Sequence, residues 1–350
     1  MSLRFLTIAG ALLVLIGGAV GWFVFMPRAP GPGGTHAVGR VDVTLTDSHG
    51  RPLPVTVWYP TTAPRNGAKP TGGGPLVSPP NAPLVLYSPG WTGVRTQSTI
   101  QTANLASHGF IVVGCDDISS DPATDPDQGR TFEMKDEATT AASIERAGRH
   151  SVAQADRILE VLHALDAGKV SLLAGRVDLK RVGVLGNSIG GPSGLAAAAR
   201  EPRIVAVFNL DGGLFGPAAT EIVPPAYFLL SSLEAFPLEA ELVSPDPYTR
   251  NNAQVSAIDL PRNRRRMKRP DSYWAQLPKA EHMDLGDALF APPRKPTLRT
   301  NFERRAIAEA IESYQTAFFR SSLLGDEAPL NALVGRNDQI VRWISRTPPP

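Results

Sequence analysis

The stretch that decides the fold runs from Val182 to Gly191 and reads VGVLGNSIGG. Its first four residues are apolar enough to form a buried strand, and the remaining six contain the pattern G-x-S-x-G around Ser188. The alanine-rich segment Pro192–Arg200 then has the composition of a closely packed helix. A strand, a sharp turn and a helix are the context in which this pattern exposes a nucleophilic serine. Because the pattern alone also occurs by chance, its context carries the prediction that Ser188 is a nucleophile.

Strand and helix patterns alternate on both sides of this stretch. Apolar runs predict buried strands at Leu84–Tyr87, Phe110–Gly114, Arg181–Leu185, Ile204–Leu210, Tyr227–Leu230 and Tyr273–Leu277. Helical patterns occur at residues 98–108, 137–167 and 302–320. Two alternating segments near the start, Val41–Thr46 and Leu53–Tyr59, predict a β-hairpin. The alternation predicts the α/β class, with a mostly parallel central sheet flanked by helices.

A serine nucleophile needs a general base, and the base needs a carboxylate that orients it. His282 is the one histidine after Ser188, and it follows the last predicted strand. Functional loops lie at the carboxyl ends of parallel strands, so we predict that His282 is the base. The earlier histidines His36, His49, His150 and His163 are interpreted as solvated, whereas His108 ends a helix.

Two residues compete for the role of the orienting acid. Asp211 directly follows the strand Ile204–Leu210 and precedes two glycines, which would place its carboxylate at the edge of the sheet. Glu234 comes shortly after the next predicted strand. We favour Asp211 and keep Glu234 as the alternative.

Six segments together resemble the platelet-activating-factor acetylhydrolase family, which shares the α/β-hydrolase fold with dienelactone hydrolases and cutinase-like polyesterases. They read PVTVWYP at residues 54–60, SPGW at 88–91, ASHGF at 106–110, GNSIGG at 186–191, LDGG at 210–213 and EHMD at 281–284. The resemblance covers about residues 40–320 and implies that Asp211 is the triad acid. The sequence departs from the family at Asn187, where the family often has histidine, and in a longer stretch between the acid and the base. Both departures concern the substrate more than the reaction.

The same resemblance implies an oxyanion hole. One donor would be the backbone N–H of Ile189, the residue after the nucleophile. The other would be the N–H of Trp91, because Pro89-Gly90 turns the chain directly after a strand. The side chain of Trp91 would either line an acyl pocket or pack in the core.

The composition excludes several classes of protein. Of the 350 residues, 42% are hydrophobic and 19% charged, and the formal net charge is +2, which argues against a disordered or general nucleic-acid-binding chain. The single cysteine, Cys115, excludes an internal disulfide and a thiolate zinc site, and we interpret it as a small buried residue. Five aspartates lie between Asp116 and Asp127, but their spacing matches no calcium loop, so we interpret this segment as solvated. We expect no metal and no organic cofactor.

The chain divides into three parts. Residues 1–34 contain an uncharged segment, Phe5–Met26, long enough to cross a bilayer, followed by a Pro/Gly linker. We predict a transmembrane anchor that holds the catalytic domain outside the cytoplasm, with a cleaved secretion signal as the alternative. Residues 35–325 form the hydrolase domain, including a lid-like insertion at about 233–270, and residues 326–350 are a C-terminal tail. The basic end of the insertion, residues 262–269, is interpreted as a solvated loop or as a contact for anionic lipid headgroups.

Together these patterns predict a membrane-anchored serine hydrolase that cleaves small-molecule or lipid carboxylic esters through an acyl-enzyme. The alternatives are an amide or polyester hydrolase and a non-catalytic binding module that has kept the fold.

Overall fold

One mixed sheet organises the molecule. The computed structural model describes residues 24–62, 71–72, 74–121, 123–128, 130–133, 135–220, 225–232, 237–292 and 299–346. Ten strands within them form a sheet in the order β10-β9-β8-β7-β6-β4-β5-β2-β1-β3. The six central strands, β5, β4, β6, β7, β8 and β9, run parallel. The pairs β1 with β2, β2 with β5 and β10 with β9 are antiparallel. This arrangement confirms the predicted α/β class with a mostly parallel sheet.

The strands follow the predicted order along the chain. They are β1 (Ala37–Thr46), β2 (Pro52–Thr61), β3 (Thr71–Gly72), β4 (Ala82–Ser88), β5 (Ile111–Cys115), β6 (Val177–Asn187), β7 (Ile204–Leu210), β8 (Ala226–Ser231), β9 (Ser272–Gln276) and β10 (Arg342–Arg346). Each of the apolar runs becomes a strand because its side chains are buried on both faces of the sheet. The hairpin forms as β1 and β2, in antiparallel register from Ala37 opposite Thr61.

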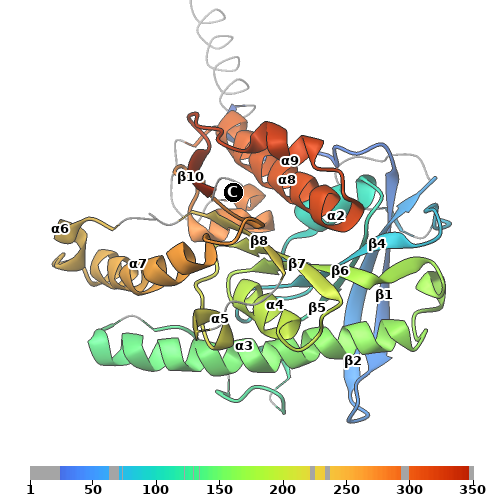
Figure 1. The fold of residues 1–350 in the computed structure, drawn as a ribbon, viewed down its shortest axis with the longest axis horizontal. Coiled ribbons are helices and arrows are strands. Elements are labelled where there is room, and N and C mark those ends of the chain that lie inside the picture. The colour runs from blue at the N-terminus through green and yellow to red at the C-terminus, as the bar shows by residue number, and fades with distance from the viewer. Residues whose placement is uncertain are drawn as a thin grey trace, which may run out of the picture.

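Helices cover both faces of the sheet (Figure 1). On one face lie α3 (Glu137–Asp166) and α4 (Gly190–Ala198), and on the other lie α2 (Thr99–Ser107), α8 (Asn301–Leu324) and α9 (Ala328–Leu333). A separate hydrophobic core fills each interface. Ile158 of α3 and Leu195 of α4 belong to the first core, and Phe318 of α8 belongs to the second. The sheet is therefore shielded from water on both sides, and functional groups collect at its carboxyl edge.

The C-terminal segment differs from the predicted tail. Residues after 325 form α9 and β10, and β10 pairs antiparallel with β9 to extend the sheet. The short sequence of β10, RWISR, has charged ends and no long apolar run, so it carries little strand signal of its own. An edge strand needs only one hydrogen-bonded neighbour, and β9 supplies it.

The basic end of the lid-like insertion differs from the predicted solvated loop. The described part of the insertion contains α6 (Glu239–Leu242) and α7 (Pro247–Arg266), so most of the basic stretch is the last turn of a helix and the residues that follow it. Cations are favourable there because they face the negative end of the helix dipole. Several are also bound by the protein. Arg262 donates to the carbonyl of Leu214 at 2.8 Å, and buried Arg266 lies over the ring of Tyr227.

The predicted anchor, Phe5–Met26, lies outside the described residues except for its last three positions. Among the residues that the structure describes, no helix has the length and apolar composition needed to cross a bilayer.

Candidate active site

The turn between β6 and α4 holds Ser188 in a strained conformation. Its φ is +50°, in the left-handed region that a non-glycine residue rarely adopts without a structural reason. Glycines on both sides make the turn possible. A Cβ atom at Gly186 would lie 2.3 Å from the backbone of Gly190, and one at Gly190 would lie 2.3 Å from the carbonyl oxygen of Ser88. The two glycines of the pattern are therefore required by close backbone contacts, which is the geometry expected of a nucleophile turn.

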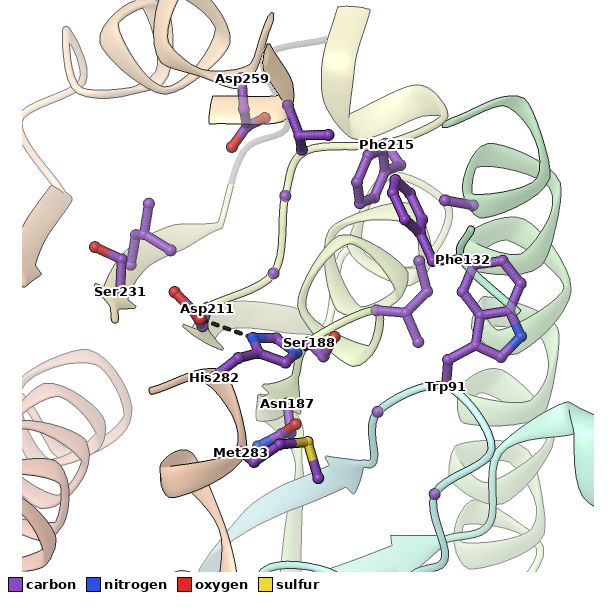
Figure 2. A pocket seen from close by; sticks show the side chains of 18 of the residues that line it. Trp91, Phe132, Asn187, Ser188, Asp211, Phe215, Ser231, Asp259, His282 and Met283 are labelled. Atoms are coloured by element: carbon purple, nitrogen blue, oxygen red, sulfur yellow. Dashed lines mark hydrogen bonds and ion pairs between the residues drawn. The ribbon is translucent and has the colours of Figure 1, made fainter. Parts of the chain in front are cut away.

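Ser188, His282 and Asp211 lie in one hydrogen-bonded chain (Figure 2). The Nε2 atom of His282 is 3.0 Å from Ser188 Oγ, and its Nδ1 atom is 2.7 Å from Asp211 Oδ2. Asp211 directly follows β7, and His282 lies in the loop after β9, so the parallel sheet delivers all three side chains to the same edge. The alternative acid, Glu234, lies outside the described residues.

Asp211 is held by a residue that the sequence patterns did not single out. The backbone N–H of Ser232 donates to Asp211 Oδ1 at 2.7 Å, and the Ser232 hydroxyl donates to Oδ2 at 2.5 Å. Asp211 itself has a φ of +56°, a conformation that aspartate tolerates better than most residues. Two hydrogen bonds from Ser232, which follows β8, thus fix the carboxylate of Asp211 while it also accepts a hydrogen bond from the imidazole of His282. Ser232 belongs to no recognisable sequence motif, and it lies next to Asp211 because β8 pairs with β7.

Two opposing effects set the protonation of the imidazole. Burial lowers the pKa of His282, but the hydrogen bond and the negative charge of Asp211 outweigh it, so the pKa lies above the usual value. The more basic ring is the better proton acceptor for a serine hydroxyl.

The N–H groups of Trp91 and Ile189, which we predict to form the oxyanion hole, differ from the N–H groups near Trp91 in their hydrogen bonding. The N–H of Gly90 donates to Gln97 Oε1 at 3.0 Å, that of Thr92 to Asp117 Oδ2 at 2.9 Å, and that of Gly93 to the carbonyl of Gly90 at 2.8 Å. Within the described structure, the N–H groups of Trp91 and Ile189 have no hydrogen-bond partner. Both residues line the cavity next to Ser188. These N–H groups are therefore available to a ligand atom.

Asp117 and His150 support this loop, and the sequence interpretation of both residues was wrong. The sequence pattern predicts that they are solvated, but both side chains are fully buried, with His150 Nε2 2.7 Å from Asp117 Oδ1. The ring of His150 packs against the indole of Trp91, with centroids 4.4 Å apart. Asp117 lies two residues after β5 and accepts a hydrogen bond from the N–H of Thr92, so it fixes the backbone on one side of Trp91. The carboxylate is buried because it has these partners, which lie far from it in sequence.

A cavity of about 590 Å³ opens over the serine. Trp91, Phe132 and Phe215 form an aromatic part of its wall, and α7 forms another part (Figure 2). The Trp91 side chain therefore lines the cavity and also packs against His150, and its role in binding the acyl group stays a prediction. Asn187, at the position where the resemblance leads one to expect histidine, also lines the cavity. A volume of this size is typical of a small-molecule site.

No family model matches the chain. Among solved structures, the chain is similar to the ferulic acid esterase from Streptomyces cinnamoneus, with a TM-score of 0.59 and 21% sequence identity, covering 92% of this chain and 99% of that one. The protein has the α/β-hydrolase fold.

Proposed function

We propose that the protein is a serine hydrolase that cleaves carboxylic esters through an acyl-enzyme intermediate. The observation that carries the proposal is the hydrogen-bonded chain of Ser188, His282 and Asp211, with Ser188 at the floor of a cavity. The similar fold of a ferulic acid esterase supports an ester as the substrate. The motifs shared with platelet-activating-factor acetylhydrolases support an esterase of that kind.

The geometry accounts for each step of the proposed reaction. Asp211 accepts the Nδ1–H of His282, which leaves Nε2 free to take the proton of Ser188 as its oxygen attacks the ester carbonyl. The imidazolium then protonates the leaving alcohol, and the acyl group stays on Ser188. A water molecule, activated by the same imidazole, hydrolyses the acyl-enzyme and restores the free serine.

The backbone N–H groups of Trp91 and Ile189 serve as the oxyanion hole. Among the described residues neither N–H has a protein partner, both residues line the cavity beside Ser188, and Asp117 holds the loop that carries Trp91. Donors fixed in advance stabilise the negative oxygen of the tetrahedral intermediate, and losing one typically costs about 3 kcal/mol of activation free energy.

A fluorophosphonate probe and a series of p-nitrophenyl esters of graded acyl length test the proposal. We expect the probe to label Ser188, and Ser188→Ala to lose both the labelling and at least about 10⁴-fold in kcat. Ser313→Ala is the matched control, because Ser313 is an exposed serine on α8. If folded Ser188→Ala retained near-wild-type turnover, the assignment would be wrong. If the wild type showed neither labelling nor turnover, the non-catalytic alternative would stand.

A further inference from the structure

The helix that covers the cavity turns a polar face toward it. Six residues of α7 line the cavity, and four of them are polar: Asn252, Ser256, Asp259 and Asn263, against Val255 and Leu260. The polar residues recur at intervals of four, three and four, which places them in one row along the helix. Trp91, Phe132 and Phe215 form an aromatic part of the cavity wall, and Asp259 of α7 lies apart from Trp91 and Phe132 (Figure 2).

Hydrogen-bond acceptors dominate the polar side. Asp259 Oδ1 accepts the N–H of Leu214 at 2.8 Å, and Oδ2 accepts the amide of Asn263 at 2.6 Å, so each carboxylate oxygen retains a free lone pair. Asn263 is only 2% exposed, and its Oδ1 atom has no partner among the described residues. The hydroxyl of Ser256 likewise has no partner within the described structure.

Such a wall suits a polar ligand better than an apolar one. A buried acceptor without a donor costs free energy, and a pocket for a purely apolar substrate would be lined with apolar side chains. The acceptors of Asp259 and Asn263 are complementary to a ligand that donates hydrogen bonds. The hydroxyl of Ser256 can donate or accept, which suits a hydroxyl group in particular.

We propose that the inward face of α7 is a recognition subsite for a hydroxyl-bearing part of the ester, bound by Ser256, Asp259 and Asn263. The inference rests on the proposed esterase function and specifies its substrate: an ester with one apolar part against the aromatic wall and one hydroxylated part against α7.

The surroundings of Asp259 favour a neutral hydroxyl over an ammonium group. The carboxylate already receives two N–H donors, and Arg262 acts on it electrostatically and binds the carbonyl of the same Leu214 whose N–H reaches Asp259. Burial nevertheless outweighs these contacts and raises the pKa of Asp259 to about 6. A hydroxyl can pair with this carboxyl group in either protonation state, because it both donates and accepts, whereas an ammonium group can only donate.

Three pairs of esters test the subsite, each pair differing in one feature. Glycerol monobutyrate against propyl butyrate places hydroxyls on the alcohol part. The p-nitrophenyl ester of 6-hydroxyhexanoic acid against that of hexanoic acid places one on the acyl part. Choline butyrate against 3,3-dimethylbutyl butyrate tests a cation in place of a hydroxyl. We expect the wild type to prefer the hydroxylated member in at least one of the first two pairs by about tenfold or more in kcat/KM, and to show no such preference for the cation.

Variants of α7 then tie the preference to its inward face. Asn263→Leu removes the unpaired acceptor at similar volume and also the amide that donates to Asp259. Ser256→Ala removes a hydroxyl alone, with little risk to folding. Both are expected to lower the hydroxyl preference by about three- to tenfold. Ile258→Ala is the matched control, because Ile258 lies on the same helix, is 41% exposed and does not line the cavity. It should leave the preference unchanged.

The outcomes separate the subsite from the esterase function. Equal rates within both hydroxyl pairs, a preference that both variants retain, or a preference for the choline ester alone would overturn the subsite while leaving ester hydrolysis intact. If the wild type hydrolysed no ester, calorimetry of glycerol monobutyrate and propyl butyrate with Ser188→Ala would still decide. Tighter binding of the glycerol ester that Asn263→Leu abolishes supports the subsite, and equal binding refutes it.

Discussion

Replacing Asp211 with asparagine tests the proposed triad most sharply. The carboxylate accepts hydrogen bonds from His282 Nδ1, the Ser232 N–H and the Ser232 hydroxyl. Asparagine has one oxygen, which the Ser232 N–H would hold, so its NH₂ group would face His282. That group can only donate, which forces Nδ1 to become the acceptor and moves the ring proton to Nε2. The imidazole would then point a proton at Ser188 and could not act as a base.

The expected loss in kcat is up to about 10⁴-fold, as for the analogous change in a serine protease, which corresponds to about 5.4 kcal/mol of activation free energy. Hydrolysis of a p-nitrophenyl ester measures kcat, and circular dichroism confirms folding. Because the change keeps the shape of the side chain, KM should change much less than kcat.

Two further variants define the result that would refute this reasoning. Glu234→Gln should be nearly silent, and Ser232→Ala should cost less than Asp211→Asn because it leaves the carboxylate in place. If Glu234→Gln lost activity and Asp211→Asn retained it, the acid would follow β8 instead of β7. The resemblance to the platelet-activating-factor acetylhydrolases would also weaken, because the position of Asp211 is one of its more specific features.

Three other predictions concern protonation and positioning. His282 must be neutral to act as a base, so kcat/KM should fall as the pH decreases, with an apparent pKa above the ordinary histidine value of 6.5. In a pH–rate profile of Asp211→Asn, this apparent pKa should be lower than in the wild type. Asp117→Asn should lower kcat by about 10- to 100-fold with little change in KM, because it loosens the loop that carries the Trp91 N–H; equal losses in binding of substrate and in kcat would argue against positioning. Burial, followed by the charge of Glu309, raises the pKa of Glu312 from 4.5 to about 8, so its contribution to stability is fully present below pH 4.5 and is lost as the pH rises to 8. Glu312→Gln should therefore raise the free energy of unfolding in urea by about 2–4 kcal/mol at pH 9 and by little at pH 4, and equal stabilities at pH 9 would contradict this assignment.

The sheet was predictable because parallel strands are buried on both faces. Their sequences are continuous apolar runs, as in Ile204–Leu210, and the strand has these bounds in the structure. β10 was missed because an edge strand of five residues is defined by its pairing with β9 rather than by its own composition. The helix α7 was missed because its residues are polar on the side that faces the rest of the protein. A helix can be predicted from the spacing of its apolar residues only where one of its faces is apolar.

Within the active site too, the groups that are neighbours in sequence could be predicted, and those from separate segments could not. Gly186, Ser188 and Gly190 are neighbours in sequence, so the turn they form leaves a pattern that can be read directly. The support of the oxyanion loop joins Thr92, Asp117 and His150, which belong to three separate segments. The sequence does not distinguish a buried aspartate from a solvated one, because only the fold shows which hydrogen-bond donors surround the carboxylate. For this reason the sequence predicts a solvated segment after β5, although Asp117 is fully buried in the structure.

The inward polarity of α7 is itself informative about function. In a helix that packs on a core, the inward face is apolar and the outward face polar. Here Ile258 is exposed, while Ser256, Asp259 and Asn263 face the cavity. The hydrogen bonds that Asp259 accepts from Leu214 and Asn263 hold α7 in place, but they leave Asn263 Oδ1 without a partner among the described residues, and a buried acceptor without a donor weakens a fold. A cavity that must bind a polar group explains this inward polarity, since the same acceptors gain their partners when the substrate is present. The insertion that carries α7 is therefore the part of the chain in which we expect substrate preference to be encoded, while the sheet and its loops supply the reaction.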